Sequence, residues 1–143
     1  MAAETELVTP TVAGSVSAAP VSRVAFWAGW VLSVLPCLML FMSAAMKLAQ
    51  PDVVMEGFEK MGYPRSLALK LGIVEVVCTV LYLFPRTAVL GAVLLTGYLG
   101  GAVATHVRVE ELSFVTPVLL GVVIWLGLYL RDRRVRDLLP LRR

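Results

Sequence analysis

Residues 71–108 read LGIVEVVCTVLYLFPRTAVLGAVLLTGYLGGAVATHVR. They form two apolar segments joined by Pro85 and Arg86, a pattern that predicts two membrane helices connected by a tight turn. The first segment carries one carboxylate, Glu75, near its middle, and the second ends at His106, the only histidine of the chain. An ionisable side chain in hydrocarbon costs roughly 2.5–3.5 kcal/mol on insertion scales. Glu75 therefore requires a charged partner, a proton or a water-lined cavity.

The composition of the whole chain also indicates a membrane protein. Hydrophobic residues make up 59% and charged residues 16% of its 143 residues, whereas a soluble domain is about 45–50% apolar and about 25% charged. The net charge of +3 comes mostly from one basic cluster near the C-terminus. No basic face is interleaved with aromatic stacking residues, so we expect the lipid bilayer, and no nucleic acid, as a partner.

The hydrophobic runs predict an all-α fold, a polytopic bundle of four transmembrane helices over about residues 24–46, 66–84, 87–106 and 114–130. The first run has no charge over roughly 22 residues, enough to cross a hydrocarbon core of about 30 Å. Pro36 lies within this run and favours a kink. Gly97 and Gly101 stand at GxxxG spacing, which allows close approach of two helices and a homodimer.

A short amphipathic helix is predicted between the first two spans. Val54, Phe58 and Met61 recur at helical spacing, acidic residues and Lys60 occupy the other face, and Gly62 supplies a stop. Such a helix lies on the membrane surface or caps the bundle.

The remaining segments flank a transmembrane domain over residues 23–131. Residues 1–22 lack an early basic residue and an apolar core before the small-residue site, so we expect a disordered, uncleaved tail. Residues 132–143 form a basic C-terminal tail. With four spans, eight Lys or Arg residues lie on the side of the termini and five on the other, which predicts a multi-pass protein of the cell membrane with cytoplasmic termini.

Polar residues on three of the predicted helices form the candidate site. Glu75 shares its helical face with Cys78, Thr79 and Tyr82. A comparable stripe on the third span runs through Tyr98 and Thr105 to His106, and Ser43 and Lys47 lie one turn apart on the first. We expect these groups to converge in the outward half of the bundle. The candidate catalytic residues are Glu75, Tyr98 and His106, and the candidate ligand-binding residues are Lys47, Cys78, Thr79, Thr105 and Arg108.

Two interpretations of Glu75 remain open at this point. In the structural one, Glu75 is protonated or paired with Lys47, Tyr98 or backbone, and specifies helix packing. In the functional one, it transfers protons or binds a polar ligand. His106 is either part of the site or a solvated residue at the membrane interface. One His, one buried Glu and two separated Cys match no recognised ligand spacing, so no metal site is predicted. Cys37 and Cys78 lack a CxxC pattern and suit core positions, with a bridge between the helices left open.

The chain resembles the DoxX-like family of small four-helix membrane proteins. The resemblance is carried by MKLAQP after the first span, by EGFEKMGYP, by residues 71–108 and by YLRDRRVRDLLP near the end, and it extends from Trp27 to Leu139. The family takes its name from a membrane subunit associated with archaeal thiosulfate:quinone oxidation, and relatives are linked to redox and oxidative-stress assemblies. The positions that match the family's polar pattern are Lys47, Glu75, Tyr98, Thr105, His106 and Arg108. This chain departs from the family at Glu110 and Glu111, where many members have a polar loop followed by aromatic residues, and in its aliphatic fourth span.

Three functions are consistent with these features, and whether the protein is an enzyme is left open. The resemblance implies an accessory subunit of a quinone- or thiol-linked redox assembly. It would have no intrinsic cofactor apart from a bound quinone, and it would pair with a membrane or soluble oxidoreductase. The second is an integral membrane enzyme, an isomerase or cyclase, that uses Glu75 as general acid or base on an apolar small molecule, with Tyr98 or His106 as its partner. The third is a small carrier or an assembly factor for membrane proteins.

Overall fold

The computed structural model describes residues 22–138, and this part of the chain is helical without strands. Its elements are α1 (Arg23–Ala49), α2 (Asp52–Lys60), α3 (Arg65–Leu83), α4 (Ala88–Arg108), the 3₁₀ turn η1 (Leu112–Phe114), α5 (Val115–Arg131) and α6 (Arg133–Leu138). The helices α1, α3 and α4, and α5 together with η1, are long and apolar enough to cross a membrane. The predicted all-α bundle of four transmembrane helices, with a short helix between the first two, is therefore confirmed.

The bounds of the four long helices lie within three residues of the predicted spans. Pro36 is buried inside α1 and does not interrupt the helix. Gly62 has a φ of +75°, the left-handed conformation that suits glycine after a helix end, and α2 stops at Lys60. The predicted N-terminal tail lies outside the described residues except for Ser22, whose Oγ caps α1 by accepting a hydrogen bond from the Ala25 amide at 3.1 Å.

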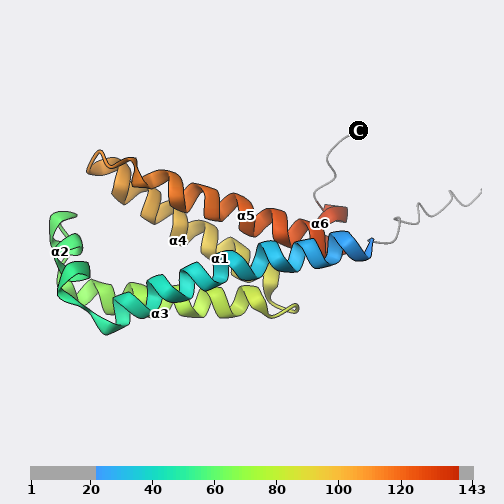
Figure 1. Ribbon diagram of the computed structural model, residues 1–143, viewed down its shortest axis with the longest axis horizontal. Coiled ribbons are helices and arrows are strands. Elements are labelled where there is room, and N and C mark those ends of the chain that lie inside the picture. The colour runs from blue at the N-terminus through green and yellow to red at the C-terminus, as the bar shows by residue number, and fades with distance from the viewer. Residues whose placement is uncertain (1–21, 139–143) are drawn as a thin grey trace, which may run out of the picture.

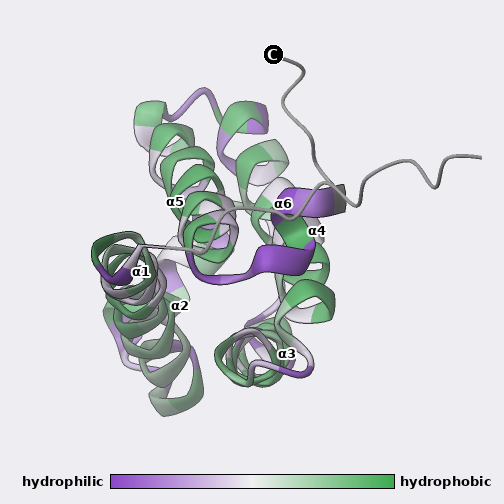
Figure 2. Cartoon of the chain, turned by 90° about the vertical axis from the view of Figure 1, so that its right-hand side faces the viewer, coloured by the Kyte–Doolittle hydropathy of each residue, from purple (hydrophilic) through white to green (hydrophobic). Residues whose placement is uncertain are grey.

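The four long helices form a ring in which α1 and α4 each pack against α3 and α5. Viewed along the bundle, the four long helices consist mostly of hydrophobic residues, whereas hydrophilic residues gather at helix ends and in α6 (Figure 2). Toward the end where α2 lies, α4 and α5 diverge from α1 and α3 (Figure 1). The bundle is therefore tight at the end that holds the termini and splayed at the other.

Two glycines hold the tight end together. A Cβ on Gly29 would lie 2.8 Å from the Arg131 main-chain N, and a Cβ on Gly127 would lie 2.7 Å from Ser33 Oγ. The α1 and α5 backbones can approach this closely only because both positions lack a side chain.

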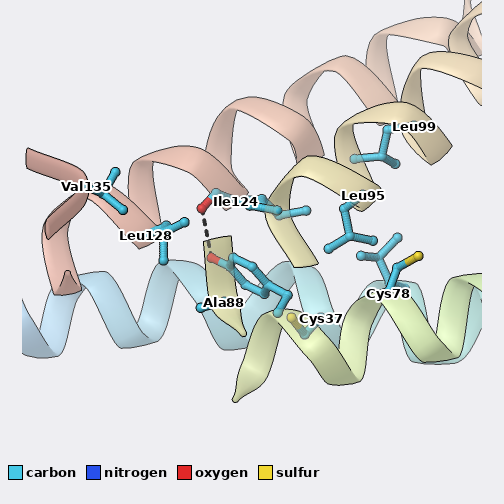
Figure 3. Packing of buried hydrophobic residues seen from close by; sticks show 11 residues of the cluster. Cys37, Cys78, Ala88, Leu95, Leu99, Ile124, Leu128 and Val135 are labelled. Atoms are coloured by element: carbon cyan, nitrogen blue, oxygen red, sulfur yellow. Dashed lines mark hydrogen bonds between the residues drawn. The ribbon is translucent and has the colours of Figure 1, made fainter. Parts of the chain in front are cut away.

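The fully buried Tyr82 connects three helices at the same level. Its hydroxyl on α3 donates a hydrogen bond to the Ile124 carbonyl of α5 at 2.8 Å (dashed line in Figure 3). The same hydroxyl lies 2.8 Å from Ser33 Oγ of α1. The Arg131 guanidinium sits 4.5 Å from the Trp30 ring centre and 4.7 Å from that of Tyr82. This node holds α1, α3 and α5 in register.

Arginines near the C-terminus also bind helix ends. Arg131 Nη2 donates to the Tyr82 carbonyl at 2.8 Å, and Arg136 donates to the Tyr129 and Leu130 carbonyls at 2.6 Å each. These carbonyls belong to the last turns of α3 and α5, whose acceptors lack intrahelical partners. The predicted basic tail over residues 132–143 thus begins with the short helix α6, and Arg136 within it contributes to the fold as well as to charge.

The tight α1–α5 crossing predicts that two glycine-to-alanine substitutions differ strongly in their effect on stability. Gly29→Ala places its Cβ against backbone atoms of α5, so we expect a loss of about 1–3 kcal/mol of stability. Gly100→Ala on α4 has no neighbouring atom within 4 Å and should be neutral or slightly stabilising, because alanine favours helices. Thermal unfolding of both variants in the same detergent measures the difference. Equal melting temperatures would contradict the close packing at Gly29.

Candidate functional site

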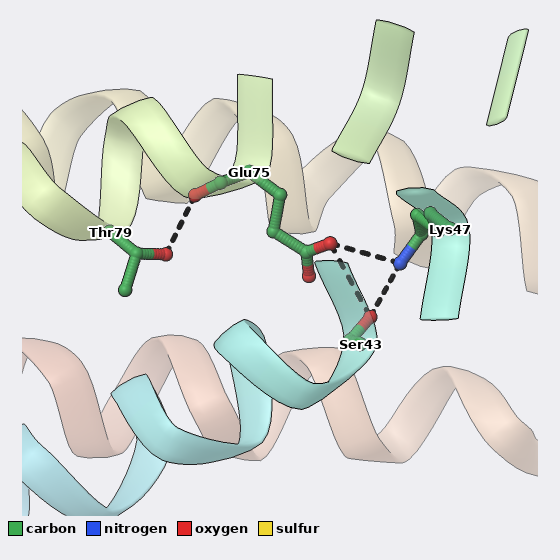
Figure 4. Close-up of polar contacts among 4 residues, drawn as sticks. All are labelled: Ser43, Lys47, Glu75 and Thr79. Atoms are coloured by element: carbon green, nitrogen blue, oxygen red, sulfur yellow. Dashed lines mark hydrogen bonds and ion pairs between the residues drawn. The ribbon is translucent and has the colours of Figure 1, made fainter. Parts of the chain in front are cut away.

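The centre of the candidate site is an ion pair between α1 and α3. Lys47 Nζ lies 3.0 Å from Glu75 Oε2, and the side chains are 17% and 2% exposed. Lys47 also donates to Ser43 Oγ at 2.5 Å, and Ser43 Oγ donates to the same Glu75 oxygen at 3.4 Å (Figure 4). Of the partners considered for Glu75, the structure therefore supplies Lys47. Both contacts reach Oε2, which leaves Oε1 free of them.

Local sequence explains how the lysine reaches the carboxylate. Ser43 and Lys47 lie one turn apart near the end of α1, so both face α3. Gly72 lies one turn before Glu75, and a Cβ on it would be only 3.2 Å from Lys47 Cβ. The missing side chain lets the lysine stem pass close to α3 and turn its ammonium toward Glu75.

Lys47, Ser43 and Glu75 lie on the wall of a cavity of about 710 Å³ in the splayed half of the bundle. All four long helices contribute to its lining, and α2 and the segment after it contribute Phe58, Met61 and Tyr63. Most of the lining side chains are apolar, among them Met39, Leu40, Leu67, Leu71 and Leu120. Charged groups on the wall of an otherwise apolar cavity are suited to bind the polar head of a lipophilic molecule.

Contacts with the end of α4 lie across the end of the cavity nearest α2. The Tyr63 hydroxyl lies 2.9 Å from Thr105 Oγ1. Arg108 donates to the Met61 carbonyl and lies over the Tyr63 ring at 5.5 Å. His106 Nδ1 lies 3.0 Å from Glu111 Oε2 in the α4–α5 connection. Met61 and Tyr63, which follow α2 and line the cavity, are thereby joined to the end of α4.

The structure brings most of the predicted site residues together. Lys47, Glu75, Tyr98, Thr105 and His106 all line the cavity. Arg108 does not line it and acts through Met61 and Tyr63.

Two predicted ligand-binding residues, Cys78 and Thr79, make contacts inside the helix bundle. Thr79 is buried and donates to the Glu75 main-chain carbonyl at 2.7 Å, and Cys78 belongs to the hydrophobic core. Neither residue is among those that line the cavity. Only part of the α3 face that carries Glu75 borders the cavity. Cys78 and Thr79 lie on the part of this face that packs in the core. Cys37 and Cys78 are both free thiols.

Sequence reasoning assigned no role in the site to three aromatic and apolar residues. Phe58, Met61 and Tyr63 line the cavity from α2 and the segment that follows it. The signal was the apolar face of the predicted amphipathic helix, which indicated a cap on the bundle without saying what lay beneath it. Ser43 was recognised only as a neighbour of Lys47, although its hydroxyl bridges both charges.

The fold and the site together define a class: a multi-pass membrane protein whose four-helix bundle encloses a largely apolar cavity beside a buried ion pair. Residues 31–127 match the DoxX-like family, and the chain belongs to this family. Comparisons with curated proteins and with solved structures gave no match. Within residues 22–138, no group of three or more His, Cys, Asp or Glu side chains is arranged to hold a metal ion.

The ion pair predicts non-additive effects of its two substitutions. Lys47→Met leaves the Glu75 charge buried without its partner, which should lower stability toward the lower end of the roughly 3–5 kcal/mol seen for broken buried pairs, since Lys47 is partly exposed. Adding Glu75→Gln removes the second charge, so the double variant should recover much of the loss. Unfolding free energies of the wild type, both single variants and the double variant form the cycle. Additive losses would mean that the two side chains do not interact.

Proposed function

We propose that this DoxX-like protein binds a lipophilic molecule with a carbonyl or hydroxyl head, of the quinone and quinol type, and serves as an accessory membrane subunit of a redox assembly. The observation that carries the proposal is the position of Lys47, Ser43 and Glu75 on the wall of the apolar cavity. An ammonium donates to a carbonyl oxygen, and a carboxylate accepts from a hydroxyl. The pair can therefore hold either form of such a head group.

The same pair would move protons during reduction of a bound quinone. Conversion to the quinol adds two electrons and two protons to the two carbonyl oxygens. In the proposal a partner oxidoreductase supplies the electrons. Lys47 hands one proton to one carbonyl oxygen, and Glu75 returns a proton to Lys47 from the solvent. The second carbonyl oxygen takes its proton directly from the solvent. The redox role in this proposal rests on the resemblance described above, whose relatives are linked to redox and oxidative-stress assemblies.

A second function is favoured by two polar residues that α4 contributes to the cavity. Tyr98 and His106 line the same cavity from α4. A carboxylate that removes a proton beside a carbonyl, with a phenol donating to the carbonyl oxygen, is an arrangement for isomerisation. In this alternative the protein is an enzyme without electron transfer, and Glu75 is its general base.

A binding experiment tests whether the Lys47–Glu75 ion pair holds the ligand. We expect the purified protein in nanodiscs to bind a decyl-substituted benzoquinone, measured by calorimetry or by fluorescence quenching. Lys47→Met and Glu75→Gln should each weaken binding at least about tenfold, because a hydrogen bond to a charged group contributes about 1.5–3 kcal/mol.

Lys70→Met is the matched control for this binding experiment. Lys70 is exposed on α3 and lies outside the cavity lining, so its loss should leave binding unchanged. Wild-type protein that ignores the quinone, or equal losses in all three variants, would refute quinone binding at this site. Turnover of an apolar carbonyl compound by the isolated protein, abolished in Glu75→Gln, would instead favour the enzyme.

We also propose that both termini lie in the cytoplasm. Both ends of the described chain lie at the tight end of the bundle (Figure 1). Arg133 and Arg134 are exposed at that end, where positive charge favours the cytoplasmic side.

A pair of C-terminal fusions tests this orientation. A green fluorescent protein fusion should fluoresce and an alkaline phosphatase fusion should be inactive, because each reporter works on only one side of the membrane. The reverse pattern would invert the proposed topology. Fusions to the α4–α5 connection should give the opposite result and serve as the control.

A further inference from the structure

The cavity extends to the outer surface of α4. Gly97 and Gly101 line the cavity, and both are exposed, with no neighbouring atom within 4 Å of a Cβ built on either. Gly97 is two residues from the buried Leu95 and Leu99, which places it about half a helical turn away from the core-facing side. A residue on that side of α4 can line the cavity only if the cavity opens sideways past the helix.

The opposite border of this lateral opening is α3. Leu67 and Leu71 line the cavity from α3 and are half-buried. The exposed surface of α4 beside the glycines carries Val93 and Leu94. The opening thus lies in an apolar surface, in two helices that are long and apolar enough to span the membrane.

Contacts near α2 lie across the alternative route along the bundle axis. Thr105 lies one turn beyond Gly101 on α4, and its hydroxyl meets that of Tyr63 at 2.9 Å. Arg108, almost one turn further, holds the Met61 carbonyl. These contacts lie across the end of the cavity, whereas the side between α3 and α4 has two glycines, Gly97 and Gly101, on its α4 border.

We propose that the ligand reaches the ion pair from the bilayer, through the opening between α3 and α4, and that it is a lipid with a long apolar chain. Its polar head binds Lys47 and Glu75, and its chain lies across Gly97 and Gly101 and continues into the membrane. The inference rests on the proposed binding function and adds the class and source of the ligand. The small residues alone would not carry it; the cavity between them and the ion pair does.

Three leucine substitutions on α4 test the opening. Gly97→Leu and Gly101→Leu place a side chain in the opening, and neither backbone position has a neighbour that it would strike. Gly100→Leu is the matched control, because Gly100 is equally unencumbered but lies outside the cavity lining. In nanodiscs, binding of the decyl-substituted benzoquinone should weaken at least tenfold in the first two variants and stay at the wild-type value in the third.

The second part of the test varies the length of the quinone's alkyl tail. The tail-less parent benzoquinone should bind at least tenfold more weakly than the decyl form after correction for partition into the bilayer. Equal affinity for the two quinones, or unchanged binding in Gly97→Leu and Gly101→Leu, would overturn the lateral opening while leaving the binding function intact. Loss of binding in Gly100→Leu as well would assign the effect to α4 itself and also overturn the proposal.

A measurement without quinone separates the two proposals. A fatty acid with a photoactivatable diazirine in its chain, incorporated in the nanodisc lipid, should label Leu71 and Tyr98 in the wild type and in Gly100→Leu. Labelling should fall at least fivefold in Gly101→Leu, as read by peptide mass spectrometry. Such a pattern supports the opening even if quinone binding fails. Absence of label in the wild type, or equal label in Gly101→Leu, would refute bilayer access.

Discussion

The close crossing of α1 and α5 at Gly29 and Gly127 is the constraint on which the rest of the bundle depends. With no side chain between them, the two backbones meet directly, and Ser33 and Tyr82 complete the contact with hydrogen bonds. Apolar burial gives little drive for helix association inside a membrane, because lipid chains are as apolar as leucine. Close packing and hydrogen bonds must therefore hold the helices, and this end of the bundle combines both.

Because the α1–α5 crossing holds one end of the bundle together, the helices can separate at the other end and leave room for a site. The helices α4 and α5 diverge from α1 and α3 away from the crossing (Figure 1), and the space between them is the cavity that holds the ion pair. A buried ion pair contributes little to stability compared with apolar packing of the same volume. In the proposed function, the pair is available to a polar group of a ligand because it lies on the wall of the cavity.

The helices and several site residues could be predicted from the sequence because their signals are local. Long uncharged runs predict membrane helices, and a carboxylate within such a run must find a partner, which identified Glu75 and offered Lys47 among the candidates. Tyr98, Thr105 and His106 followed from the same helical periodicity. Cys78 and Thr79 were assigned to the ligand because sequence places them on the same face as Glu75, but periodicity has no means of dividing one face between cavity and core. The sequence likewise could not predict that the cavity reaches Gly97, because GxxxG spacing is equally consistent with a close helix contact and with an opening between helices.

The sequence by itself determined the class of protein, the number and approximate limits of its spans, the helix between the first two and the need of Glu75 for a partner. These follow from hydrophobicity, helical period and the cost of charge in hydrocarbon, all of which act over a few turns of chain. Only the tertiary structure decided which partner Glu75 has, that a cavity lies beside the pair, and that Arg131 and Arg136 bind helix ends. Each of these depends on how far one helix stands from another, and that distance is set by glycines and hydrogen bonds more than 40 residues apart in the chain, such as Ser33 with Tyr82.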